Sequence, residues 1–340
     1  MDEPRPEEPR LDEVRLSDPA TPDDREILGR YRVLQVISIA LIGAGLLLPI
    51  VAFVLNPRIL STGDDPELVQ RLLGPILLIG LGGLLLLIGL VMNAVRSLIV
   101  RAALPPERYR GPAIFVVLLL AVIIGTIASF PAVGTAVALA ADAPVSVIGT
   151  LLLLISTQIG LLAVTGGLVV APRALAGIRL APPGRLLRTL VLGLALAVPA
   201  WIGATLLAVV ASLLLEAIGV APDNMLLDSF LEQADPTVIL VAFIVIAPIG
   251  EELFFRGVVY NAWERERGAT VATFGSAALF AVIHGSLYTL VPIFALGVGL
   301  AVLYRATRSL TATIAMHAGF NAISVTIALL ARAGILSLPT

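Results

Sequence analysis

The chain has 340 residues, of which 58% are hydrophobic and only 14% are charged. A soluble domain is roughly 45–50% apolar and about 25% charged, so this chain has more apolar surface than one globule can bury, and lipid must cover part of it. The net charge of −2 gives no indication of a nucleic-acid partner. There is no cysteine and no lysine, which excludes disulfides, thiolate nucleophiles, Cys-ligated zinc and lysine-based catalysis.

Residues 1–30 differ from the rest of the chain. They contain ten acidic residues, five arginines and five prolines, with almost no apolar periodicity. Such a segment cannot bury enough apolar surface to fold alone, and it lacks the basic start and apolar run of a signal peptide. We predict a disordered tail.

Long stretches without charge predict the membrane spans, because a helix needs about 20 apolar residues to cross the hydrocarbon core. The stretches are 33–57, 72–95, 111–141, 143–172, 189–215, 236–250, 268–304 and 309–331. The sixth resumes after two glutamates and continues to 260, and breaks near 285–292 divide the seventh into helices at 270–286 and 289–304. Apolarity is continuous rather than alternating, which excludes barrel strands. The prediction is an all-α, polytopic transmembrane helix bundle with about eight or nine spans.

Arginine placement predicts the orientation. In a nine-span chain the arginine-rich loops all fall on one side: Arg96, Arg101, Arg108 and Arg110; Arg173, Arg179, Arg185 and Arg188; Arg265 and Arg267; Arg305 and Arg308. The opposite side receives Asp142, Glu216, Asp223, Asp228, Glu232 and Asp235. Because basic loops favour the cytoplasm, the N-terminus is expected inside the cell, in a multi-pass protein of the cell membrane.

Ionisable and strongly polar side chains inside the spans gather in the last third of the chain. They are Glu251, Glu252, Arg256, His284, His317 and Asn321. Such residues are costly in lipid and usually mark a protein interior or a functional site. Glu252 and Arg256 are four residues apart and can pair on one helix face, which leaves Glu251 without that partner and suited to act as a general base or acid.

The same spacing of four residues recurs in Phe280–His284 and in His317–Asn321, so three helices each offer a polar stripe. Packed together, they would form one buried pocket that activates water and donates to an oxyanion. The same residues could instead hold one divalent metal such as zinc, through Glu251, His284 and His317. There is no HExxH motif and no serine in a Gly-x-Ser-x-Gly setting. Taken singly, the ion pair, the histidines and the asparagine are equally explained as structural contacts between helices.

These three motifs resemble the CPBP family of intramembrane proteases, also called the Abi or CAAX-protease family. The matching residues are Glu251-Glu252-Leu-Phe-Phe-Arg256 for EExxxR, Phe280-Ala-Val-Ile-His284 for FxxxH and His317-Ala-Gly-Phe-Asn321 for HxxxN. The resemblance covers roughly residues 185–331. It implies an endopeptidase acting on a membrane-associated peptide or protein, which is prenylated in the case of eukaryotic relatives.

The resemblance also implies roles. Glu251 would activate water, His284 would hold that water, and His317 with Asn321 would stabilise the oxyanion. Glu252, Arg256 and Phe280 would support the site. Both a metal-dependent and a metal-free glutamate mechanism are compatible with this set.

The expected organisation is a tail at 1–30, about four spans at 31–184, and a catalytic transmembrane core at 185–340. Two other functions stay open. A proton-coupled transporter also needs buried Glu and His residues, although no inverted repeat is visible. A non-catalytic membrane protein of the bacteriocin-immunity type would keep the fold and cleave nothing.

Overall fold

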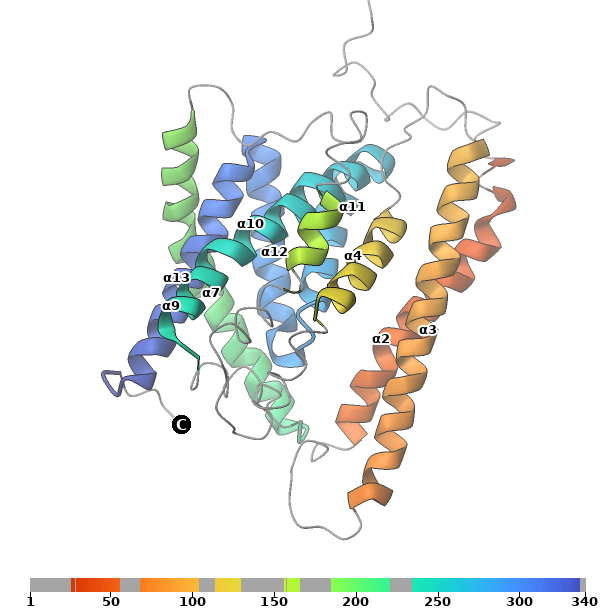
Figure 1. Ribbon diagram of the computed structural model, residues 1–340, viewed down its shortest axis with the longest axis horizontal. Coiled ribbons are helices and arrows are strands. Elements are labelled where there is room, and N and C mark those ends of the chain that lie inside the picture. The colour runs from red at the N-terminus through yellow and green to blue at the C-terminus, as the bar shows by residue number, and fades with distance from the viewer. Residues whose placement is uncertain are drawn as a thin grey trace, which may run out of the picture.

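The computed structural model describes residues 26–27, 29–55, 68–103, 114–129, 156, 158–165, 185–220 and 234–336. Every element in these ranges is helical, and they contain no strand. The all-α prediction is therefore confirmed for the described part of the chain. Figure 1 shows a long helical hairpin at one side and a bundle built from the C-terminal half of the chain.

The hairpin consists of α2 (Arg32–Leu55) and α3 (Leu68–Ala103), which lie side by side (Figure 1). Glycines let the two backbones approach: a Cβ at Gly45 would lie 2.5 Å from the backbone nitrogen of Leu86. One interhelical hydrogen bond is buried there, from Asn93 Nδ2 to Ser38 Oγ at 3.0 Å. Close packing of small residues with an occasional polar bond is how helices associate in lipid.

Two shorter pieces lie between the hairpin and the bundle. These are α4 (Ile114–Ser129) and a helical segment at 158–165. A Cβ at Gly160 would lie 2.5 Å from the carbonyl oxygen of Ala121, so the two pieces pack at backbone distance. Both contribute side chains to the apolar core that also contains Phe254 and Phe255.

The bundle surrounds one interrupted helix. Its segments follow one another directly: α9 (Pro236–Leu240), the π-helix η2 (Val241–Ile246), α10 (Ala247–Glu252), the π-helix η3 (Leu253–Tyr260) and α11 (Asn261–Val282). Around it stand α7 (Leu186–Ala217), α12 (Leu287–Thr307) and α13 (Leu310–Arg332). π-helical turns are rare and often mark functional sites; here they flank the turn that carries both glutamates.

Local sequence signals explain where these helices begin. Asp235, Ser286 and Ser309 are the N-caps of α9, α12 and α13, and each accepts a hydrogen bond from a backbone N–H of the first turn. Inside α11 the backbone breaks at Gly268, whose φ of 84° is open to glycine but strained for other residues. An apolar helix Gly268–Val282 follows this break.

Six helices of the described residues are long and apolar enough to cross a membrane. They are Arg32–Ala52, Leu73–Val100, Leu186–Ala217, Pro236–Glu264, Leu287–Thr307 and Leu310–Arg332. The shorter apolar helices Val116–Gly125 and Gly268–Val282 correspond to two more of the nine predicted spans. The span predicted at 143–172 and the tail at 1–30 lie mostly outside the described residues, so a count of eight or nine stays a prediction.

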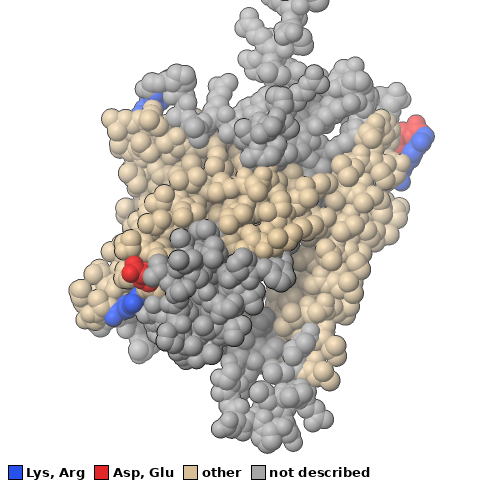
Figure 2. Space-filling model, in the orientation of Figure 1, with Lys and Arg blue, Asp and Glu red and all other residues tan. Residues whose placement is uncertain are grey.

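The surface agrees with a membrane environment. Figure 2 shows a broad described face without charged side chains, and the few blue and red atoms lie near its margins. Many large apolar side chains are exposed on the outer helices, for example Leu187 at 75% and Leu206 at 63%. Lipid would cover this surface, and the polar residues of the bundle point inward instead.

Candidate active site

Glu252 and Arg256 form a fully buried ion pair one turn apart across α10 and η3. Arg256 Nη1 donates to Glu252 Oε1 at 2.8 Å, and both side chains are 0% exposed. Arg256 Nη2 donates to the carbonyl oxygen of Gly297 on α12 at 3.0 Å, and the guanidinium carbon lies 4.8 Å from the ring centre of Phe280. A buried charge needs such additional partners to be tolerated. This pair therefore ties the helix of the glutamates to α12 and α11.

Glu251 lies beside this pair and is engaged on one oxygen only. Gln158 Nε2 donates to Glu251 Oε1 at 2.9 Å. Glu251 Oε2 is buried and accepts no hydrogen bond from the described residues, and it lies 3.8 Å from Nε2 of His317. The sequence predicted that the Glu251 carboxylate has no partner. The structure corrects this, because the uncharged amide of Gln158, on the helical segment 158–165, donates to one of its two oxygens.

His317 stands between the two carboxylates. Its Nδ1 lies 3.1 Å from Glu252 Oε1, and its Nε2 faces Glu251. Since an ionised carboxylate only accepts, Nδ1 carries the proton of this hydrogen bond. The ring is 3% exposed and is therefore fixed in position by Glu252, with its second nitrogen directed at the candidate base. The gap of 3.8 Å is too long for a direct hydrogen bond and is of the size that one water can bridge.

His284 follows the end of α11 and reaches the molecular surface. Its Nδ1 lies 2.7 Å from the carbonyl oxygen of Phe280, which makes Nδ1 the donor and leaves Nε2 available as an acceptor. The Phe280 ring lies edge to face with both imidazoles, with centroid distances of 4.8 Å to His284 and 5.6 Å to His317. Phe280 thus separates and orients the two histidines.

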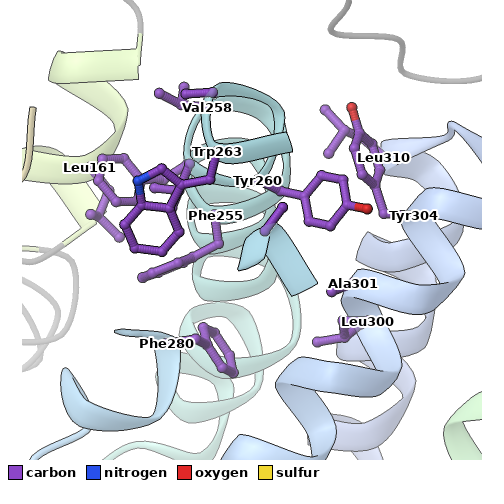
Figure 3. Packing of buried hydrophobic residues seen from close by; sticks show 14 of the residues in the cluster. Leu161, Phe255, Val258, Tyr260, Trp263, Phe280, Leu300, Ala301, Tyr304 and Leu310 are labelled. Carbon is purple, nitrogen blue, oxygen red and sulfur yellow. The ribbon is translucent and has the colours of Figure 1, made fainter. Parts of the chain in front are cut away.

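The aromatic ring of Phe280 belongs to a larger apolar layer beneath the site. Its centroid lies 5.2 Å from that of Phe255 in an edge-to-face contact, and Figure 3 shows both rings on the side of η3 that faces Leu161 and Trp263. Phe254 and Phe255 are completely buried.

Asn321 lies one turn after His317 on α13. Its Nδ2 donates to the carbonyl oxygen of Phe243 in η2 at 2.8 Å. One N–H of the amide is therefore used to connect α13 to the π-helix. Of the residues that the sequence singled out, five are in direct mutual contact, namely Glu251, Glu252, Arg256, Phe280 and His317. His284 joins them through Phe280, and Asn321 is held from the opposite side by Phe243.

In the described residues, the side chains of Glu251, His284 and His317 do not form a metal centre. Within the described ranges, no group of three or more His, Asp or Glu residues is placed to hold a metal ion. His284 is separated from His317 by the ring of Phe280, so these three side chains are not grouped around one point as they stand in the described residues. Metal dependence of the site stays a prediction.

Gln158 is the residue that sequence reasoning missed. It is uncharged, so a search for charged groups within the spans passes over it. A signal was nevertheless present, because Gln158 interrupts an otherwise apolar run at 151–165 together with Ser156 and Thr157. Buried polar residues in a span usually bond to another helix.

Comparison with known proteins adds one finding. Residues 233–323 match the family model described as type II CAAX prenyl endopeptidase Rce1-like. No curated protein and no solved structure matches the chain. The matched range runs from just before α9 into α13 and includes Glu251, Glu252, Arg256, Phe280, His284, His317 and Asn321.

Proposed function

Since residues 233–323 carry the Rce1-like domain of the CAAX-protease family, we propose that this integral membrane protein is an endopeptidase in which Glu251 activates water to hydrolyse a peptide bond of a membrane-associated protein. The observation that carries the proposal is the free oxygen of Glu251, buried and directed at His317 Nε2. Glu252, its neighbour in sequence, also has a buried Oε2 without a hydrogen bond among the described residues. Its Oε1 is bound to Arg256 and to His317, however, so we assign the base to Glu251, which is not paired with the guanidinium.

In the first step a water molecule lies between Glu251 Oε2 and the substrate carbonyl. Glu251 takes a proton from the water while the oxygen of the water bonds to the carbonyl carbon of the substrate. The product of this step is a tetrahedral oxyanion. His284 Nε2 accepts a hydrogen bond from the second O–H of the water and so orients the nucleophile. Nε2 is the acceptor because Nδ1 already donates to the carbonyl oxygen of Phe280. The role of His284 requires the substrate to approach from the exposed end of α11.

In the second step His317 and Asn321 stabilise the oxyanion. The spare N–H of Asn321 and, in the protonated ring, Nε2–H of His317 are the donors. The C–N bond then breaks, and Glu251 returns the proton to the leaving nitrogen, giving one carboxylic acid and one amine.

The short helix Gly268–Val282 supports a wet site below the membrane surface. It has about 15 residues and spans roughly 22 Å, less than the hydrocarbon thickness of about 30 Å. The turn with His284 would therefore lie within the membrane. Irregular backbone at that depth is tolerated where it lines a cavity with water or is buried in protein, and His284 is exposed.

The direct test is peptide cleavage by the purified protein in liposomes. A fluorogenic peptide ending in a CAAX sequence is offered with and without a prenyl group. We expect cleavage by wild type, and loss of roughly a thousandfold or more in Glu251→Gln, which keeps the shape and removes the base. Retained folding is checked by circular dichroism and by the elution volume in detergent.

Three results would overturn the proposal. Normal cleavage by Glu251→Gln would exclude the assigned base. Proton or solute transport without cleavage would favour the transporter alternative. If correctly folded wild type cleaves neither the prenylated nor the unmodified peptide, the non-catalytic alternative would be favoured. A parallel series with a chelator and with added zinc measures metal dependence, for which the mechanism above expects no effect.

Access from the cytoplasm is part of the proposal. His317 lies two turns after the loop with Arg305 and Arg308, and arginine-rich loops favour the cytoplasmic side. Because the chain has no cysteine, Ala318→Cys places a single thiol beside His317. We expect an impermeant maleimide to label it in inside-out vesicles; labelling only in right-side-out vesicles would reverse the orientation.

A further inference from the structure

We propose that Gln158 is a positioning residue of the same site, contributed by a helical segment outside the matched family domain, and that its amide fixes Glu251 so that only one carboxylate oxygen is free to take the proton of water. This inference rests on the proposed function, and it assigns part of that function to a segment that precedes residues 233–323 by many residues.

The contact between the two side chains is specific and buried. Gln158 is 6% exposed, Glu251 is 8% exposed, and Nε2 of the amide donates to Glu251 Oε1 at 2.9 Å. A hydrogen bond to a charged acceptor in such surroundings is stronger than one between neutral groups. The carboxylate is therefore held in one rotamer.

Gly250 makes room for this amide. A Cβ at position 250 would clash with Oε1 of Gln158, and it would lie 3.7 Å from the Cβ of Gln158. A side chain at position 250, in the turn before Glu251, would therefore require the amide of Gln158 to shift. The backbone of α10 and the side chain from 158–165 thus fit each other at this point.

The segment that carries Gln158 is itself firmly placed. Gly160 touches the backbone of α4, and Leu161 and Val164 belong to the apolar core with Phe255. Figure 3 shows Leu161 next to Trp263, on the same side of η3 as Phe255. The segment that carries Gln158 is thus packed against α4 and against the apolar core of the bundle.

An uncharged donor suits this task. An arginine or lysine at the same place would neutralise Glu251 and weaken it as a base, as Arg256 does for Glu252. The amide instead occupies Oε1 and leaves the charge in place. Oε2, which lies 3.8 Å from His317 Nε2, is then the oxygen left to take a proton from the water of the proposed reaction.

The geometry can be tested without any activity. The two Cβ positions at 158 and 250 are 3.7 Å apart, within the range of about 3.5–4.5 Å for disulfides, and the native chain has no cysteine. We expect Gln158→Cys combined with Gly250→Cys to form a disulfide in membranes, detected after proteolysis between the two positions by a gel shift that a reductant reverses. Gln158→Cys combined with Gly203→Cys, which lies in open space, is the negative control.

Kinetics test the role. Gln158→Met keeps the shape of the side chain and removes the donor, and Gly250→Ala pushes the amide away. For both variants we expect kcat to fall roughly ten-fold while KM stays within about two-fold, because the base rather than the substrate site is changed. Thr165→Val is the matched control: Thr165 is buried on the same helical segment, and its hydroxyl has no partner, so kcat should be unchanged.

The outcomes separate this inference from the proposed function. If wild type and Gln158→Met cleave equally fast, Gln158 does not position the base, although the protein is still an endopeptidase. The same conclusion follows if wild type cleaves but no disulfide forms between positions 158 and 250. An equal loss in Thr165→Val would reduce the effect to packing and would also overturn the inference. If wild type does not cleave while the disulfide forms, the proposed function fails and the contact is structural only.

Discussion

Helix α3 and the interrupted helix Pro236–Glu264 are both long, apolar helices able to cross a membrane, yet they are buried to very different extents. In the most apolar window of each, 18% of α3 is buried against 50% of Pro236–Glu264. Inside its interface with α2, α3 has one buried amide–hydroxyl bond, from Asn93 to Ser38. Pro236–Glu264 instead carries two carboxylates and a guanidinium, all buried.

The difference shows that the apolar residues of a helix decide whether it enters the membrane, and that its polar residues decide where it packs within the protein. Lipid tails are as apolar as leucine, so apolar burial gains little when helices associate. The hairpin is held by glycines that let backbones touch, and the central helix is held by charges that only the other helices can satisfy. The predictions below contrast these two kinds of contact, beginning with the largest expected effect.

Removing Arg256 should be the most destabilising change. Arg256→Met leaves Glu252 without its main partner at a fully buried position, and such a loss costs about 3–5 kcal/mol. Unfolding in mixed SDS–detergent micelles measures it. Replacing both charges, Glu252→Gln with Arg256→Met, should recover a large part of the free energy of unfolding because no buried charge is left alone.

The hairpin side supplies the control for this prediction. Arg30 and Glu26 form an ion pair at 2.7 Å whose side chains are 69% and 66% exposed. Arg30→Met should leave the free energy of unfolding unchanged within error, since water solvates the remaining carboxylate. A cost for Arg256→Met no larger than that for Arg30→Met would show that the central helix is not held by its charges.

Glycine contacts should separate stability from catalysis. A side chain at Gly193 would clash with the carbonyl oxygen of Ala312 and displace α13, which carries His317. A shift of about 1 Å in a catalytic group can cost on the order of a hundredfold in rate. Gly45→Val forces the hairpin apart at Leu86, and each variant should cost about 1–3 kcal/mol in stability.

Cleavage kinetics in liposomes distinguish the two glycines. Gly193→Val should lose most of kcat, and Gly45→Val should keep it in the fraction that is folded. Equal losses in both variants would mean that the hairpin and the site are coupled more tightly than their packing indicates.

Most of the site was predictable from the sequence, because in lipid a charged residue stands out against its surroundings. Glu252 with Arg256 at a spacing of four residues predicted an ion pair, and the pair is present. The spacing could not show that Arg256 also bonds Gly297, since that contact depends on where α12 packs. Whether these residues perform catalysis stays a prediction.

Three structural features escaped the sequence for different physical reasons. Gln158 has no charge and so gives a weak signal, and its partner is 93 positions away. The π-helical segments η2 and η3 have ordinary apolar sequences, and their widening arises from the packing around them. The exact place of the break between the spans predicted to end at 260 and to begin at 268 also escaped the sequence, because only the backbone shows that it falls at Gly268, with a φ of 84°.

A smaller effect is expected for the buried hydrogen bond from Asn93 to Ser38 across the hairpin. Asn93→Leu removes the donor to Ser38, which keeps its own bond to the carbonyl oxygen of Gln35. Interhelical bonds in membranes contribute about 0.6–2 kcal/mol, so the loss should be about 1 kcal/mol, and kcat should not change. A large fall in kcat would show that the hairpin acts on the site, contrary to the comparison made above.

The smallest effect is expected at Arg308, in the turn between α12 and α13. Arg308 bonds both oxygens of Glu264 at 2.5 and 2.8 Å, and this contact raises the pKa of Arg308 above its usual value. The stabilisation is therefore fully present below the unfolded pKa and is lost only when the pH rises through the still higher folded pKa. Between about pH 6 and 10 the difference between wild type and Arg308→Ala should stay constant.

Solvent limits how much the ion pair between Arg308 and Glu264 contributes to the free energy of unfolding. The Arg308 side chain is 49% exposed, so water and salt screen the pair, and Arg308→Ala should cost about 0.5–1 kcal/mol, less at high ionic strength. The exposed Arg305 on the same turn is the matched control, and Arg305→Ala should cost nothing measurable. A cost for Arg308→Ala that is independent of salt would place this ion pair with the buried charges of the central helix, because only desolvated pairs escape screening.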